Sequence, residues 1–261
     1  MPNKNNNNLA QSLAALHKPG NPVVFANVWD GISAKALLET SGAQAAATAS
    51  YAIAASLGIE DDDLTLEQNL NAVRIIARVL DKRIPLSADL QDGYGDQLDK
   101  AIIGAIEAGA VGCNIEDVYP HSSTLYSLHE MVSRIKRVKA VAAENGVPDF
   151  VINARTDALR VGFDMQQVAV RGKAYLEAGA ATVFVWGGRA RSLTEQDVAL
   201  LVEEFGGRLA MKLGDQGGEA LTTKRLGELG LARISVGPTL MRVAVEKFKE
   251  VASRIFSGGS L

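Results

Sequence analysis

The sequence predicts an α/β fold, a (β/α)8 TIM barrel, and three observations support this prediction. Short apolar runs alternate along the chain with longer stretches of helical periodicity. Several of these stretches end at a glycine, the residue typical of a helix C-terminus. The length of 261 residues matches the roughly 250 that one such barrel needs.

The apolar runs have the length of strands rather than helices. Strands that alternate with helices pair in parallel, so we expect one parallel sheet. The expected strands cover residues 23–28, 45–50, 84–90, 111–116, 150–155, 182–186, 209–213 and 233–236.

The stretches between these runs predict the helices of the barrel. Thr65 and Gln68 form the capping-box pattern of a helix start, and the phrase EAGA occurs twice where a helix should turn into a strand. An open, doubly wound sheet is the alternative, but no GxGxxG turn follows the first strand. The expected helices cover residues 33–41, 65–80, 97–108, 128–145, 165–178, 194–205, 221–229 and 238–256.

Composition excludes several classes of protein. The net charge of −3 argues against nucleic-acid binding, and no apolar run is long enough for a membrane span. A single cysteine cannot form an internal disulfide or a CxxC zinc site. We expect a soluble, cytoplasmic protein with a disordered, Asn-rich lead-in at residues 1–8 and one catalytic barrel domain at residues 9–261.

Polar side chains collect where the first five expected strands end, which is where barrel enzymes place their active sites. These strand ends carry Asn27 and Trp29, Ser50 and Tyr51, Asp89 and Gln91, Asn114 and Glu116, and Asn153 and Arg155.

Residues two apart on a strand share a face, so Asp89 and Gln91 are expected to point together into the barrel mouth, as are Asn114 with Glu116 and Asn153 with Arg155. Unpaired carboxylates there would be costly. A bound Mg²⁺ would compensate Asp89 and Glu116, and Arg155 would then hold a carboxylate or phosphonate of the substrate. The alternative is a salt-bridge network of Asp89, Glu116 and Arg155 that merely plugs the barrel.

These residues lie in stretches by which the chain resembles the isocitrate lyase / phosphoenolpyruvate mutase superfamily. The resemblance extends over almost the whole sequence after the Asn-rich start. The matching stretches are NVWDGISA at 27–34, ASLGIED at 55–61, ADLQDGYG at 88–95, AGAVGCNIED at 108–117, VINARTD at 151–157 and AYLEAGA at 174–180.

The resemblance implies a Mg²⁺-dependent enzyme, with Mn²⁺ as a possible substitute, that acts on a small 2-oxo or 2-hydroxy acid through an enolate. It implies that Asp89 binds the metal directly. Three further positions would support the metal, mostly through water, and they are Asp61, Gln91 and Glu116. Catalysis and substrate binding are expected from Arg155, Glu116, Ser50, Tyr51, Trp29 and Asn153.

The sequence departs from the superfamily pattern in two places. Gln91 stands where an acid is usual, which removes one negative charge from the site. The loop at 118–127 lacks the K-[KR]-C-G-H motif of the lyases, and the single cysteine, Cys113, is expected to pack inside a strand. The same loop resembles the gate of the mutases and of phosphonopyruvate hydrolase only loosely, with His121 as a candidate acid/base.

Several functions stay open at this point. The first is C–C bond cleavage of an oxaloacetate-like acid by lyase, hydrolase or decarboxylase chemistry. Others are C–P bond chemistry, binding of a 2-oxo acid without turnover, and Schiff-base chemistry at Lys212; the glycine-rich stretch at 214–218 is a weaker candidate for binding phosphate. The superfamily also implies a homo-oligomer, a dimer of dimers that exchange the C-terminal helix at 238–256.

Overall fold

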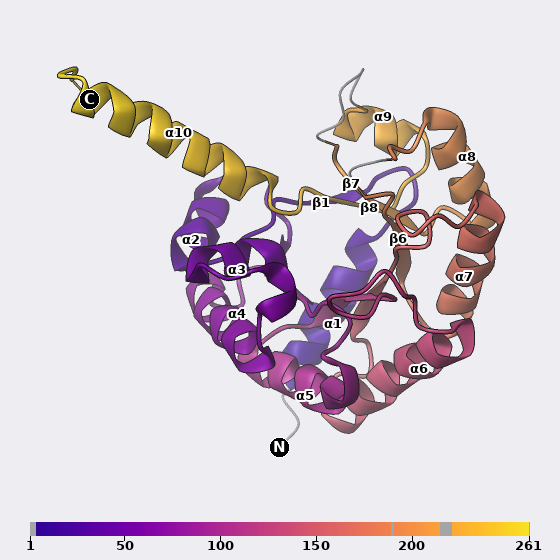
Figure 1. Cartoon of the computed structure of the whole chain (residues 1–261). Coiled ribbons are helices and arrows are strands. Elements are labelled where there is room, and N and C mark those ends of the chain that lie inside the picture. The colour runs from indigo at the N-terminus through magenta and orange to yellow at the C-terminus, as the bar shows by residue number, and fades with distance from the viewer. Residues whose placement is uncertain (1–3, 189–190, 215–220, 261) are drawn as a thin grey trace.

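The strands of the protein form one parallel, eight-stranded sheet that curls into a barrel, as the sequence predicts. The computed structural model describes residues 4–188, 191–214 and 221–260. The helices surround the sheet in a ring (Figure 1). The strands are β1 (Val23–Phe25), β2 (Ala46–Ala47), β3 (Leu86–Asp89), β4 (Gly112–Glu116), β5 (Val151–Thr156), β6 (Thr182–Val185), β7 (Leu209–Lys212) and β8 (Arg233–Ser235).

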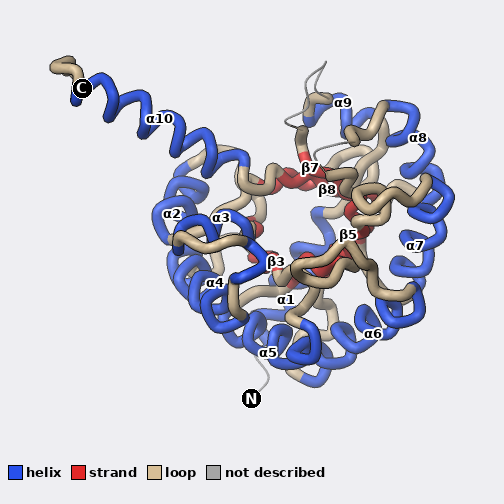
Figure 2. Tube along the Cα trace, in the orientation of Figure 1, coloured by secondary structure: helices blue, strands red, loops and turns tan. Residues whose placement is uncertain are grey.

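Neighbouring strands follow one another around the barrel in the order β1-β8-β7-β6-β5-β4-β3-β2. Between β1 and β2 the barrel closes by a single parallel bridge from Val28 to Thr48. Val28 donates its N–H to the carbonyl of Ala47 at 2.9 Å, and Ala49 donates to the carbonyl of Val28 at 3.2 Å. Figure 2 shows the resulting ring of strands inside the ring of helices.

Each predicted helix is present, with ends shifted by a few residues. The capping box at Thr65 and Gln68 forms as expected. Gly109 and Gly179 are the glycines of the two EAGA phrases and have φ of 110° and 111°, which suits the reversal from helix into strand. The helices are α1 (Lys4–Leu16), α2 (Gly31–Glu39), α3 (Ser50–Leu57), α4 (Leu66–Leu80), α5 (Leu98–Ala108), α6 (Leu128–Glu144), α7 (Met165–Glu177), α8 (Glu195–Glu204), α9 (Thr223–Glu228) and α10 (Thr239–Phe256), with 3₁₀ turns at Asp61–Asp63 and Gly95–Gln97.

The N-terminal segment differs from the expectation. Residues 4–8 were expected to be part of a disordered lead-in, but the structure places them in α1. Asn6 is buried and donates to the carbonyl of Ile106 at 3.3 Å, while Asn7 and Gln11 both donate to the carboxylate of Asp149. These contacts therefore anchor α1 to the barrel.

Helix α3 was also not expected, because its start was assigned to the second strand. That strand ends at Ala47, and Ser50 already begins the helix. This difference matters for the site, since the first backbone N–H of α3 points toward the end of β3.

Helix α10 projects away from the barrel (Figure 1). Although it is amphipathic, no residue of it is buried in the monomer. Its apolar side chains include Phe248, which is 75% exposed, and Phe256, which is 88% exposed.

No helix of the described chain is both long and apolar enough to cross a membrane.

Candidate active site

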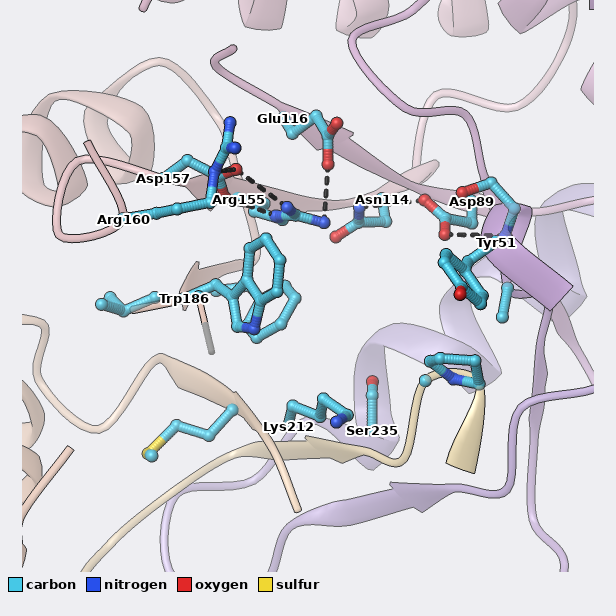
Figure 3. Close-up of a pocket in the computed structure, with 18 of the residues that line it drawn as sticks. Tyr51, Asp89, Asn114, Glu116, Arg155, Asp157, Arg160, Trp186, Lys212 and Ser235 are labelled. Carbon is cyan, nitrogen blue, oxygen red and sulfur yellow. Dashed lines mark hydrogen bonds and ion pairs between the residues drawn. The ribbon is translucent and has the colours of Figure 1, made fainter. Parts of the chain in front are cut away.

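A cavity of about 770 Å³ opens at the carboxyl ends of the barrel strands. Both its acids and its cations come from residues far apart in the sequence (Figure 3). Among the predicted site residues, those that line it are Ser50, Tyr51, Asp61, Asp89, Glu116, Asn153 and Arg155.

Asp89 ends β3 and is held from two sides. Its Oδ2 accepts the backbone N–H of Ser50 at 3.0 Å, and its Oδ1 accepts Nδ2 of Asn114 at 3.1 Å. A carboxylate at the N-terminus of α3 lies where the helix dipole favours negative charge. Neither oxygen has a cationic partner within salt-bridge distance in the described chain, so the carboxylate keeps lone pairs for a ligand.

The barrel interior next to Asp89 is a chain of polar side chains across four strands. Asn114 accepts a hydrogen bond from Asn153 at 2.8 Å, and Asn153 accepts one from Thr182 at 2.7 Å. This chain fixes the orientation of the Asn114 amide, and with it the orientation of Asp89. Asn153 therefore acts on the site through Asn114 as well as lining the cavity.

Asp61 lies in the turn after α3 and also faces the cavity. Burial, and secondarily the nearby Asp89, raise the pKa of Asp61 to about 6. Nε2 of Gln91 donates to the backbone carbonyl of Asp61 at 2.6 Å and to its Oδ1 at 3.1 Å.

Gln91 does not share the face of Asp89, contrary to the expectation from strand alternation. Strand β3 ends at Asp89, and Gln91 adopts a left-handed backbone conformation with φ of 52°. The alternation rule holds only within an extended strand. Gln91 consequently lies outside the cavity lining and orients Asp61 from behind.

Arg155 is the centre of a second cluster, on β4 and β5. Its Nη1 lies 2.7 Å from Glu116, and its Nε and Nη2 donate to the two oxygens of Asp157 at 2.6 and 2.9 Å. Asp157 also accepts a hydrogen bond from Arg160 at 2.7 Å. The Arg155 guanidinium carbon lies 4.3 Å from the centroid of the Trp186 ring.

Burial raises the pKa of Glu116 well above its ordinary value, and the attraction of Arg155 opposes this effect. Asp157 also raises it, followed by Asp89 and Asp61. The mouth of the barrel thus concentrates three carboxyl groups, Asp61, Asp89 and Glu116, at one cavity. That concentration is an electrostatic environment suited to a divalent cation.

A direct metal cage is not formed by protein side chains. Within the described residues, no group of three or more His, Cys, Asp and Glu side chains could hold an ion. Mg²⁺ does not require such a group, because it keeps several waters and is commonly held by one or two carboxylates. The donor set of Asp89, with Asp61 and Glu116 at the same cavity, therefore fits a water-rich Mg²⁺ site.

Besides Gln91, two more predicted site residues lie outside the cavity lining. Trp29 does not line the cavity; it packs beside Ile53 and Leu64. The His121 side chain is 62% exposed and faces Asp62 and Asp63, with its Nε2 3.5 Å from Asp63.

Other residues of the 118–127 loop reach the cavity in its place, namely Tyr119 and Ser122. Cys113 is fully buried in β4, as expected for a packing residue, and burial raises its thiol pKa to about 12. Lys212 lines the cavity, whereas residues 215–218 of the glycine-rich stretch lie outside the described residues.

Sequence reasoning missed several side chains that line the cavity. Asp157 and Arg160 lie beyond the end of β5, and Trp186 lies just after β6. Their positions after strand ends could have identified them as candidate site residues. Arg233 also lines the cavity, but its place at the first position of β8 gave no such signal.

Fold and site together define a barrel enzyme with an acid-rich cavity at the carboxyl ends of its strands. Residues 13–256 match the phosphoenolpyruvate phosphomutase family. The chain therefore belongs to this family, within the isocitrate lyase / phosphoenolpyruvate mutase superfamily.

Individual relatives support this assignment. Phosphonopyruvate hydrolase of Variovorax sp. (strain Pal2) is 29% identical over 222 residues, which cover 81% of this chain and 74% of the relative. The 2-methylisocitrate lyase of Escherichia coli (strain K12) is 37% identical over 161 residues, 57% of this chain and 52% of the relative. A solved structure of phosphonopyruvate hydrolase with oxalate and Mg²⁺ superimposes with a TM-score of 0.82 at 27% identity, covering 96% of this chain and 88% of that one.

Proposed function

We propose that this protein is a Mg²⁺-dependent enzyme that cleaves a C–C bond of a small 2-oxo or 2-hydroxy acid, with an oxaloacetate-like compound as substrate, through an enolate intermediate. The observation that carries the proposal is the placement of Asp89 and Arg155 at one cavity, together with the partly buried acids Asp61 and Glu116. The relative solved with oxalate and Mg²⁺ supports it, since oxalate has the shape and charge of an enolate of pyruvate.

In this proposal Asp89 binds the metal directly, and Asp61 and Glu116 bind its water ligands. Mn²⁺ would serve as a substitute, because it takes the same oxygen ligands. When bound, the cation stabilises the negative charge that develops on the substrate oxygen. Gln91 contributes by holding Asp61 rather than by facing the metal.

Arg155 would hold the substrate carboxylate and stabilise the enolate charge. Its guanidinium is fixed by Glu116, Asp157 and the Trp186 ring, so little reorganisation is needed when charge develops. Ser50 and Tyr51 would contact the same carboxylate from the start of α3, where the helix dipole favours anions.

Glu116 is the proposed proton donor or acceptor at the enolate, because it lines the cavity and burial raises its pKa well above the ordinary value of a glutamate. The acid/base role of His121 stays a prediction. It would require the 118–127 loop to move, because the exposed imidazole faces Asp62 and Asp63 in this structure.

C–P bond hydrolysis is the second candidate. The observation that favours it is the similarity to phosphonopyruvate hydrolase over 81% of the chain. The same Asp89 and Arg155 would serve that reaction, because cleavage of a C–P bond next to a 2-oxo group also leaves an enolate.

The proposed substrate of the site is thus a small carboxylic acid. We also propose that two copies of the chain exchange α10 and that such pairs form a tetramer, because α10 leaves its apolar side chains exposed in the monomer.

A substrate screen tests the proposed reaction. Purified protein with Mg²⁺ is mixed with oxaloacetate, malate derivatives, methylisocitrate or phosphonopyruvate, and products are followed by NMR. We expect turnover of a C–C substrate that stops with EDTA and returns with added Mg²⁺. Turnover of phosphonopyruvate alone would select the second candidate, and turnover that resists EDTA would contradict both.

A further inference from the structure

The floor of the cavity carries a buried cation that the proposed reaction does not use. Arg233, on β8, is 2% exposed and yet lines the cavity. Its Nε and Nη1 atoms are buried and have no hydrogen-bond partner among the described residues. A buried guanidinium with two unpaired donors is costly, so its retention at a cavity wall points to a ligand.

The surroundings of Arg233 hold the guanidinium in place without neutralising it. Its central carbon lies 4.2 Å from the centroid of the Phe25 ring, which covers one face. Cys113 is a neutral thiol at neutral pH, because its pKa is raised to about 12, and His17 is neutral because burial and Arg233 lower its pKa to about 4. Asp89 is the carboxylate that acts on Arg233, and it forms no salt bridge with it.

A second buried polar atom that lines the cavity also lacks a partner. The hydroxyl of Ser87, on β3, is buried, faces the cavity and has no hydrogen-bond partner in the described chain. Ser87 precedes Asp89 by two residues on the same strand and therefore shares its face, roughly 7 Å deeper in the barrel. A chain of a few carbon atoms spans that depth.

We propose that Arg233 and Ser87 form a second anion-binding subsite on the barrel floor, which holds a distal carboxylate of the substrate. This inference rests on the proposed function and deepens it, because it assigns side chains to the distal carboxylate that an oxaloacetate-like substrate carries. The reacting end lies at Asp89 and Arg155, and the distal carboxylate accepts hydrogen bonds from Nε and Nη1 of Arg233 and from the Ser87 hydroxyl.

Matched ligands test the subsite by calorimetry with Mg²⁺ present. The probes are 2-oxo diacids of four to six carbons, the 2-oxo monoacids of equal length and oxalate, which has no distal group. For at least one chain length, we expect the diacid to bind about ten- to hundredfold more tightly than its monoacid, the range for a charged hydrogen bond. Arg233→Met should remove this preference. The affinity for oxalate should stay within about twofold of the wild-type value, because losing a charged hydrogen bond to oxalate would lower it about tenfold.

Two further variants keep the test decisive. Ser87→Ala, a small change in the barrel wall, should reduce the diacid preference without altering oxalate binding, and so serves if Arg233→Met fails to fold. The exposed Arg208→Met is the matched control and should behave as the wild type.

The outcomes separate this inference from the proposed function. Oxalate binding without any diacid preference in the wild-type protein overturns the subsite and leaves the proposed function standing. A preference that survives both Arg233→Met and Ser87→Ala, or an equal loss of oxalate and diacid binding, also overturns it. Absence of Mg²⁺-dependent oxalate binding in the wild type overturns both.

Discussion

Arg155 is held by two carboxylates, and each of its contacts has a separate consequence. Asp157 has no exposed side-chain surface and pairs with both Arg155 and Arg160, so this side of the guanidinium is a structural contact. Glu116 is partly exposed to the cavity, where a substrate carboxylate would compete with it for Nη1. Arg155 thus contributes both to the stability of β5 and to ligand binding.

Replacing Arg155 with Met should therefore reduce both stability and ligand binding. Glu116 loses its arginine partner and Asp157 keeps only Arg160, and we expect the free energy of unfolding to fall by about 3–5 kcal/mol in urea titrations. Arg155→Lys should recover part of the stability but not the binding, because an amine cannot donate to two carboxylates in a planar fork.

The control for this pair is Arg137→Met, which breaks an exposed ion pair with Asp99. Loss of an exposed pair should cost at most about 1 kcal/mol. Equal stability of the Arg155 and Arg137 variants would contradict the role given to Arg155.

At the scale of single residues, polar residues at strand ends predicted part of the cavity lining. Asp89, Glu116 and Arg155 all line the cavity, while their roles stay predictions. Gln91 was misplaced because the chain leaves the extended conformation right after Asp89, and a left-handed glutamine cannot be recognised from a sequence. Arg233 was missed because a charged residue at the start of a strand is ordinarily expected at the surface.

Helix α1 is also tied to the barrel at its C-terminal end, where His17 follows it. His17 follows α1, lies against Phe25 of β1 with ring centroids 6.2 Å apart, and bonds through Nδ1 to the carbonyl of Leu13 at 2.8 Å. Its other ring nitrogen is buried without a partner in the described chain. Burial, aided by the charge of Arg233, lowers the pKa of His17 to about 4.

This environment predicts a pH-dependent stability. In the unfolded chain His17 takes up a proton near pH 6.5, whereas in the folded protein it does so near pH 4. The unfolded state therefore binds more protons between these values, and folding stability should fall as the pH drops from 6.5 to 4. Urea titrations at several pH values across this range should show that the free energy of unfolding of His17→Leu changes less with pH than that of the wild type.

His129→Asn, on the exposed side of α6, is the control and should keep the wild-type pH dependence. If the free energy of unfolding of His17→Leu depends on pH as strongly as that of the wild type, the lowered pKa of His17 is not the cause of the pH dependence.

At the scale of elements, the sequence predicted the strands well because each is a short buried run between polar segments. It failed at α3, since residues 45–57 form one nearly continuous apolar stretch, and periodicity cannot separate a buried strand from a buried helix there. It failed at α1 because the asparagines suggest disorder by composition. Their order comes from partners about a hundred residues away, at Ile106 and Asp149.

On the scale of the whole molecule, the exposed apolar side of α10 is the feature that a single copy of the chain does not explain. An amphipathic helix that buries none of its residues needs another surface for its apolar side. The proposed exchange with a second copy would supply that surface.

Phe248→Asp tests the assembly. We expect sedimentation velocity to show a smaller species than for the wild type, because a charge would replace the largest apolar side chain in the middle of α10. Glu250→Gln, on the polar side, is the control and should leave the mass unchanged. A wild-type protein that sediments as a monomer would contradict the exchange.

The most direct test of the proposed function is the Mg²⁺ dependence of oxalate binding, measured by calorimetry on the wild-type protein and on Asp89→Ala. We expect oxalate to bind the wild type with Mg²⁺ present and not with EDTA, and we expect Asp89→Ala to lose binding under both conditions while remaining folded. Binding that persists in EDTA, or in folded Asp89→Ala with Mg²⁺, would contradict a metal-dependent enolate site at Asp89.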